Sequence, residues 1–318
     1  MNTTGSAEGR GRLLICFDFE ASYGMPHKGD PYDLPGNATA ILEELAKHQA
    51  RAVFFVVGRM IDEHPDVVQA IADAGHEIGL HGYDHDNLAR YDAEALALLD
   101  KNLARVTSVI EDMTGRRPNA FRAPYLLAPN FYRAEVYSIL REQGFRWVSN
   151  REVRYPVELL RPRPGKLPMP YAWRSLDGSP RLARNRVLLA MLNAGLITKE
   201  DFFGSRAARL RWLLGKRDPF TRDGMTEVPV HSPLDCDLVG LPHHDEDTPK
   251  VVLDYSRAVV REAAATPPGQ LSTLTFHDWI VTGGNRLVLL ADALSAAREA
   301  GSVISTISES PDWLPAVA

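Results

Sequence analysis

The chain has 318 residues, of which 45% are hydrophobic and 24% charged, so it is long enough for one large domain or two ordinary ones with a substantial core. The formal net charge of -5 leaves no basic surplus, which argues against a nucleic-acid partner. No apolar run is long enough to span a bilayer, so we expect no insertion into a membrane.

The cysteine content and the N-terminal residues bear on the cellular compartment in which the protein is expected. Cys16 and Cys236 are too few for a disulfide framework, and neither belongs to a C-x-x-C pair. A reducing compartment is the simpler expectation. The first residues, MNTTGSAEGRGR, lack the apolar core of a secretory signal. We therefore predict a cytoplasmic protein.

Strand and helix patterns alternate along the first half of the chain. We expect strands at 12–19, 52–57, 76–81, 119–124 and 145–149, and helices at 37–49, 64–75, 92–113 and 131–144. Asn37 is the expected N-cap of the first helix. Short connections between alternating strands and helices imply parallel strands, which fit either an open doubly wound sheet or a closed barrel.

The pattern breaks near Tyr155, where a proline-rich segment predicts irregular chain and a basic, helical stretch follows. It resumes with strands at 225–230, 271–277 and 302–307 and helices at 248–264 and 285–301. We therefore predict an α/β protein with a single domain over residues 1–318, including an insertion at about 155–224.

Four predicted strands end in side chains that can carry chemistry. The clusters are Asp18-Phe19-Glu20, His81-Gly82-Tyr83-Asp84-His85, Phe121-Arg122-Ala123-Pro124-Tyr125 and His277-Asp278-Trp279. In an open parallel sheet or a barrel, the carboxyl ends of the strands share one rim, where active sites of such folds lie. Each cluster has an ordinary structural explanation alone, but their coincidence at one rim predicts an active site.

Two of these clusters suggest a metal site. On a helical turn, His81 and His85 would share a face and close on one ion, although surface or capping histidines are the alternative for this pair alone. Asp18 and Glu20 would point the same way from a regular strand. Two histidines and a carboxylate with open positions are typical of a hydrolytic zinc site or a non-haem iron site.

The order of the motifs resembles the polysaccharide deacetylase family, the NodB-homology enzymes of carbohydrate esterase family 4. The family's acid pair, H-x-x-x-H, R-x-P-Y/G and late L-x-H are similar to Phe17 to Glu20, His81 to His85, Arg122 to Tyr125 and Leu274 to His277. The resemblance covers residues 12–150 and about 225–307. It implies a distorted (β/α) barrel of the NodB-homology type and metal-dependent hydrolysis of an amide or ester.

The resemblance implies that Glu20, His81 and His85 bind a divalent metal, with zinc as the default and iron, cobalt, nickel or manganese as alternatives. Family members usually have two adjacent acids, whereas this chain has a D-x-E spacing and a glutamate. The opposite assignment, with Asp18 as the ligand and Glu20 as the base, therefore stays open.

The resemblance also implies the groups that move protons and hold the substrate. Asp18 would be the general base, Arg122 would orient Asp18, and His277 would protonate the leaving amine. The backbone N–H of Tyr125 would help to hold the oxyanion. Trp279 is a further candidate for substrate contact.

One family motif has no clear counterpart. It supplies an aspartate that orients the acid histidine near a tryptophan, and after Trp147 no such aspartate follows. Glu152 or Asp278 is the expected substitute. His231 follows a strand that can reach the same rim, so it is a candidate for substrate contact, although a loop histidine without a role explains it equally well.

These features predict a deacetylase that removes an N-acetyl group from a small soluble amino sugar, a sugar nucleotide or a secondary-metabolite intermediate. The enzyme alternative keeps the site but cleaves another C–N amide bond, as in allantoinase-like or deformylase-like hydrolysis. A carbohydrate-binding protein with a decayed site is the non-enzyme alternative. The aromatic residues of the insertion predict either a lid over the ligand or the interface of a homo-oligomer.

Overall fold

The computed structural model describes residues 9–27, 29–125, 131–153, 218–231 and 234–310. One nine-stranded sheet forms its centre, in the order β10-β1-β2-β3-β4-β5-β8-β7, with β11 also paired to β1. The strands are β1 (Arg12–Phe19), β2 (Val53–Val56), β3 (Glu77–Leu80), β4 (Ala120–Phe121), β5 (Trp147–Val148), β7 (Phe220–Arg222), β8 (Met225–Glu227), β10 (Leu271–His277) and β11 (Val303–Ser305). All pairs are parallel except β7 with β8.

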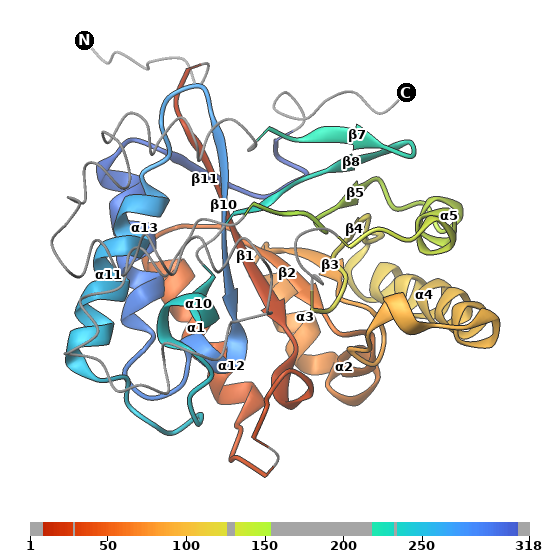
Figure 1. Ribbon diagram of the computed structural model, residues 1–318, viewed down its shortest axis with the longest axis horizontal. Coiled ribbons are helices and arrows are strands. Elements are labelled where there is room, and N and C mark those ends of the chain that lie inside the picture. Colours follow the sequence, from red (N-terminus) through yellow and green to blue (C-terminus); the bar gives the residue numbers. More distant parts are fainter. Residues whose placement is uncertain (1–8, 28, 126–130, 154–217, 232–233, 311–318) are drawn as a thin grey trace, which may run out of the picture.

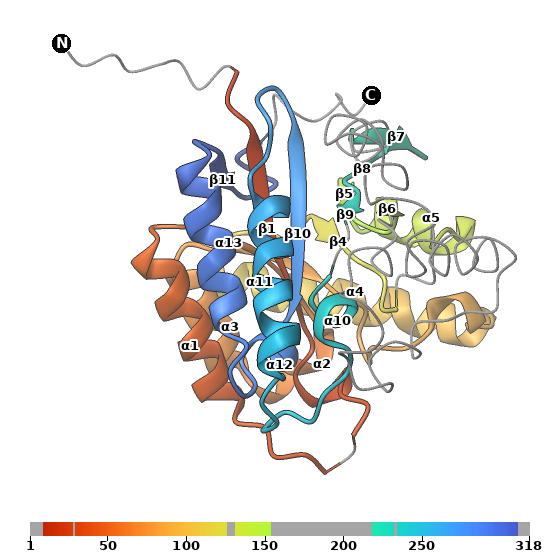
Figure 2. The same ribbon diagram turned by 60° about the vertical axis from the view of Figure 1, so that its left-hand side comes forward.

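Helices connect the strands and cover the outer face of the sheet (Figures 1 and 2). They are η1 (Ala21–Tyr23), α1 (Leu34–Lys47), α2 (Gly58–Glu63), α3 (Pro65–Asp73), η2 (Leu88–Arg90), α4 (Ala93–Thr114), α5 (Ala134–Glu142), α10 (Asp235–Val239), α11 (Lys250–Ala264), α12 (Asp278–Val281) and α13 (Val288–Glu299). Figure 2 shows α1, α13 and α11 together beside β1 and β10. A separate two-stranded sheet pairs β6 (Glu152–Val153) with β9 (Val230–His231).

The first helix begins earlier than the sequence predicts. Asp33, not Asn37, is the N-cap of α1, and its side chain accepts a hydrogen bond from the Gly36 N–H. Pro35 lies in the first turn, where its missing N–H needs no partner. The expected cap at Asn37 was wrong because this aspartate and proline start the helix one turn upstream. Asp92 caps α4 at the predicted position.

Alternate residues of β1 face two different cores. Leu13, Ile15, Phe17 and Phe19 belong to the large cluster between the sheet and the helices. Their even-numbered neighbours, Leu14 and Cys16, pack with residues of other strands in a second cluster inside the curl of the sheet. Asp18 continues this inner row, so the strand delivers a carboxylate to the open end of the curled sheet.

The expected α/β fold is confirmed, and the sheet curls into a half-barrel whose edges within the described residues are β10 and β7. Most of the predicted insertion at about 155–224 lies outside the described residues. Its last part contains β7, which extends the main sheet by an antiparallel hairpin with β8. Within the parts that the structure describes, every helix is too short or too polar to cross a bilayer.

Candidate active site

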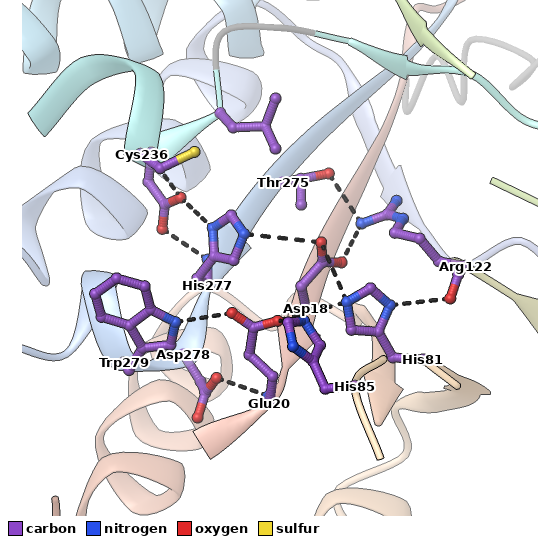
Figure 3. Close-up of polar contacts among 12 residues, drawn as sticks. Asp18, Glu20, His81, His85, Arg122, Cys236, Thr275, His277, Asp278 and Trp279 are labelled. Carbon is purple, nitrogen blue, oxygen red and sulfur yellow. Dashed lines mark hydrogen bonds and ion pairs between the residues drawn. The ribbon is translucent and has the colours of Figure 1, made fainter. Parts of the chain in front are cut away.

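The carboxyl ends of four strands bring the predicted clusters together. Asp18 lies opposite His277 in the register of β1 and β10. Leu80 pairs with Phe121, so the next residues, His81 and Arg122, emerge side by side from β3 and β4. Figure 3 shows these side chains converging from their separate strands.

Glu20, His81 and His85 form one buried group of metal-binding atoms. The Oε2 atom of Glu20 lies 2.7 Å from Nε2 of His85 and 3.5 Å from Nε2 of His81. All three side chains are buried, and their ligand atoms lie within 4.8 Å of one another. Atoms bound about 2 Å from a common zinc ion would have separations of this size. The donor set therefore fits the divalent metal that the motifs predict.

The tautomer of His81 is fixed by its backbone partner. Nδ1 of His81 lies 2.9 Å from the carbonyl oxygen of Arg122, which only accepts hydrogen bonds, so Nδ1 carries the proton. The lone pair of Nε2 is then directed at the Glu20 carboxylate. Metal-binding histidines commonly donate their other ring N–H to a backbone carbonyl in this way, which holds the ring in place.

The two histidines do not lie on a helical turn, contrary to the expectation from their spacing. Residues 81–87 contain no helix, and residues 83–85 form a bend. Gly82 and His85 have positive φ angles of 71° and 57°, and this left-handed backbone folds His85 back over His81. The ring centroids are 5.2 Å apart, so the pair converges by a different local structure.

Asp18 is held by Arg122 beside the metal-binding group. Nη1 of Arg122 donates to Oδ1 of Asp18 at 2.5 Å, and both side chains are buried. Burial opposes ionisation of Asp18, but the positive charge of Arg122, the largest opposing cause, helps to lower the pKa of Asp18 below its usual value. Asp18 is therefore an ionised carboxylate with its other oxygen, Oδ2, directed into the site.

His277 faces this oxygen, with Nε2 3.9 Å from Oδ2 of Asp18. Its other nitrogen, Nδ1, lies 2.6 Å from Oδ1 of Asp235. Burial lowers the pKa of His277, but the charge and hydrogen bond of Asp235 overcome this and raise the pKa to about 10. The ring is therefore an imidazolium at neutral pH, with Nε2–H as a proton donor.

Asp235 is the functional residue that the sequence reasoning missed. Glu152 and Asp278 were expected in its place, but Glu152 lies in β6 and Asp278 accepts the backbone N–H groups of Glu20 and Ala21. Asp235 opens α10, shortly after the strand that ends at His231. An acid just beyond a strand that reaches the rim is the signal that could have identified it.

Asp235, Cys236 and His277 also lie close enough together to suggest a second metal site. However, Oδ1 of Asp235 already binds His277 Nδ1 and the Cys236 N–H, and Oδ2 binds the His277 N–H. These hydrogen bonds instead make Asp235 the carboxylate that orients the imidazole of His277.

The three residues predicted to contact substrate lie in different surroundings. Trp279 is buried, and its Nε1–H donates to Oε1 of Glu20 at 2.8 Å. His231 is buried in β9, where Nδ1 accepts the Thr273 N–H at 2.8 Å and so ties β9 to β10. These contacts give both residues structural partners. Tyr125 is 59% exposed, has a φ of 64° and packs its ring 4.6 Å from that of His85.

Comparison with known proteins agrees with the motifs. The family model for polysaccharide deacetylase matches residues 8–148. A peptidoglycan-N-acetylglucosamine deacetylase of Bacillus cereus is 32% identical over 85 residues, which cover 27% of this chain and 30% of that protein. A chitooligosaccharide deacetylase of Azorhizobium caulinodans is 30% identical over 116 residues, covering 36% of this chain and 52% of that protein. The chain thus spans between about a third and half of the length of these relatives.

Solved structures agree on the fold. A family 4 carbohydrate esterase from Streptomyces lividans, solved in complex with acetate, superposes with a TM-score of 0.50 and 15% identity over 96% of this chain and 97% of that chain. At this identity the likeness concerns the fold alone. The family model and the sequence relatives show that the N-terminal part of this chain is similar to polysaccharide deacetylases.

Proposed function

We propose that this chain is a metal-dependent hydrolase of the polysaccharide deacetylase family that removes an N-acetyl group from an amino sugar. The observation that carries the proposal is that three buried groups of side chains lie together at one rim of the sheet. These are the Glu20–His81–His85 group, the Asp18–Arg122 pair and the His277–Asp235 pair.

Glu20, His81 and His85 would hold the divalent metal, and zinc fits two imidazoles and a carboxylate best. When bound, the metal would lower the pKa of water and polarise the acyl carbonyl. The opposite assignment of the two acids has less support. Glu20 contacts both histidines, whereas Asp18 is bound to Arg122 and lies 4.0 Å from Nε2 of His81.

Asp18 is the proposed general base. Its Oδ1 is taken by Arg122, so Oδ2 is the oxygen that accepts a proton from the attacking water. Its lowered pKa keeps it ionised and ready to accept that proton at neutral pH. Arg122 fixes the direction of the carboxylate and also donates to Ser149 at 3.0 Å, which holds the guanidinium in place.

His277 is the proposed general acid. Its Nδ1–H is bound by Asp235, so only Nε2–H is directed into the site, where it donates a proton to the leaving nitrogen. This cleaves the C–N bond and releases a free amine and a carboxylate. The backbone N–H of Tyr125 remains our prediction for an oxyanion donor.

The substrate class follows from the relatives, which are named for peptidoglycan and chitooligosaccharides. We propose an N-acetylated amino sugar, and a small soluble one such as a sugar nucleotide or secondary-metabolite intermediate as the narrower choice. The cytoplasmic location and a homo-oligomeric state stay predictions from the sequence. Hydrolysis of an N-formyl group or a cyclic amide is the alternative for the same site.

An acetate-release screen of the purified, metal-loaded chain tests the proposal. The substrates are N-acetylglucosamine, an N-acetylated sugar nucleotide, chitooligosaccharides and peptidoglycan fragments, with metal content measured in parallel. We expect one metal ion per chain and acetate released with an equal amount of free amine. Formate release, or ring opening without acetate, would favour the alternative hydrolysis. A chain that binds no metal and releases nothing would support a decayed site.

A further inference from the structure

The two oxygens of the Glu20 carboxylate have different partners. Oε2 faces the imidazoles of His81 and His85, and Oε1 accepts the indole N–H of Trp279 at 2.8 Å. Figure 3 shows the indole approaching Glu20 from the side opposite the histidines. Glu20 and Trp279 are 3% and 2% exposed, so water does not compete for this hydrogen bond. One oxygen is therefore occupied before any metal binds.

Gly24 supplies the space that the longer side chain of Glu20 needs. A Cβ atom at position 24 would overlap Oε1 and Cδ of Glu20 and would lie 2.8 Å from Cγ. Gly24 has a φ of -85°, a backbone conformation that any residue adopts. Its missing side chain, and not its backbone freedom, is what the site uses. The Glu20 carboxylate folds back against the chain four residues later.

The backbone of Glu20 is held by the neighbour of Trp279. Oδ1 of Asp278 accepts the Glu20 N–H at 2.9 Å and the Ala21 N–H at 3.2 Å. Ala21 has a φ of 48°, an unfavourable left-handed conformation that these hydrogen bonds help to maintain. Asp278 itself is fully buried and is bound by the hydroxyl of Tyr32. Three consecutive residues thus have related roles. His277 is the proposed acid, Asp278 holds the backbone of Glu20, and Trp279 holds its side chain.

We propose that Gly24, Asp278 and Trp279 are positioning residues that make Glu20 a metal ligand through Oε2 alone. The inference rests on the proposed function only in that Glu20 must bind the metal. The glutamate side chain reaches the indole with Oε1 and both imidazoles with Oε2. An aspartate at this position would be one methylene shorter and would lose either Trp279 or the metal. The glutamate of the D-x-E motif, the space at Gly24 and the indole of Trp279 then depend on one another.

Metal affinity tests the role of Trp279 without reference to turnover. Zinc is titrated against a chromophoric chelator with the wild type, Trp279→Phe and the matched control Trp147→Phe, which alters a tryptophan packed in the inner cluster of the sheet. Loss of a partner that orients a ligand weakens metal binding by about 10- to 100-fold. We expect that loss for Trp279→Phe and wild-type affinity for Trp147→Phe. Equal affinity of the two variants would overturn the proposal.

A double-mutant cycle tests the role of Gly24 and remains informative if Trp279→Phe folds poorly. Gly24→Ala should weaken zinc binding at least 10-fold in the wild type, because the methyl group displaces the Glu20 carboxylate. In a Glu20→Asp background the same change should cost little further affinity, since the shorter side chain no longer fills that space. Equal losses in both backgrounds would refute the fit between Gly24 and Glu20.

These outcomes separate the inference from the proposed function. If the wild type binds no metal, the proposed function fails and the positioning role fails with it, because Glu20 is then not a metal ligand. If the wild type binds one ion and either the Trp279→Phe or the Gly24→Ala prediction fails, the positioning role is wrong while the proposed function stands. The visible spectrum of the Co²⁺-loaded protein adds a direct readout. Release of Oε1 by Trp279→Phe should change the coordination of the ion and hence this spectrum, whereas Trp147→Phe should leave it unchanged.

Discussion

His277 Nδ1 lies 2.6 Å from Asp235 Oδ1, although 42 residues separate the two in the chain. The Asp235 carboxylate also accepts the His277 backbone N–H at 2.6 Å, so it fixes the position of the residue as well as the orientation of the ring. Asp235 is itself buried at the start of α10. The pair gives the proposed acid a fixed orientation and a raised pKa.

Asp235→Asn should therefore lower turnover by about 100-fold, within the range expected for general acid catalysis. Loss of the carboxylate removes the main cause that raises the pKa of His277 from 6.5 to about 10. An acid must be protonated to act, so the alkaline limb of the pH–rate profile should move to lower pH. The kcat/KM of wild type and variant is measured against pH at fixed metal occupancy. An alkaline limb at the wild-type position would show that Asp235 does not tune His277.

Asp18→Asn should abolish acetate release while the metal stays bound. The amide cannot accept the proton from water, and a general base contributes about 10²- to 10⁴-fold. Because Asp18 lies 4.0 Å from Nε2 of His81, whereas Glu20 lies 2.7 Å from Nε2 of His85, metal content should equal that of the wild type. Turnover and metal stoichiometry are measured on the same preparation. Retained turnover would exclude Asp18 as the base, and lost metal would support it as a ligand.

The positions of the site residues could be predicted because they depend on strand ends. The alternation of β1 is readable from the sequence, and it places Asp18 on the inner face beyond Leu14 and Cys16. The parallel order of the strands then brings His81 and His277 to the same rim. These features follow from local pattern and a general rule of parallel sheets.

Other features depend on tertiary contacts or on backbone conformations that the spacing of residues in the sequence does not specify. Asp235 reaches His277 across 42 positions of the sequence, far from Trp147, beside which the orienting aspartate is expected. The pairing of Gly24 with Glu20 becomes visible only when the side chain is seen folded back. The expected helical turn at His81 and His85 failed because a positive φ at His85 gives the same convergence by a non-helical path.

Arg122→Met should lower the stability of the fold and should also impair Asp18 as the general base. Arg122 is fully buried, so removing it leaves the Asp18 carboxylate buried without its ion-pair partner, which destabilises by about 3–5 kcal/mol. Removal of the guanidinium should also raise the pKa of Asp18. The base must be ionised, so the acidic limb of the pH–rate profile should move to higher pH. Thermal unfolding and the pH profile are the two measurements, and an unmoved acidic limb would contradict this role for Arg122.

His76 should make the fold sensitive to acid through a group remote from the proposed active site. It is buried, and its Nδ1 accepts the Ala52 N–H at 3.3 Å, which requires a neutral ring. Burial, followed by the charge of Arg51, lowers the pKa of His76 from 6.5 to about 4. A folded-state pKa below the unfolded value gives stability that is fully present above pH 6.5. That stability falls as the pH drops toward 4.

The loss expected from this shift is about 3 kcal/mol of unfolding free energy, at about 1.4 kcal/mol for each unit of pKa difference. His76→Gln removes the titrating group, so the variant should lose less stability than the wild type between pH 6.5 and 4, even if it is less stable at pH 7. Urea unfolding of both proteins across this interval measures the difference. Parallel curves of unfolding free energy against pH would mean that protonation of His76 does not oppose folding, and the acid sensitivity would then have to arise from the buried carboxylates.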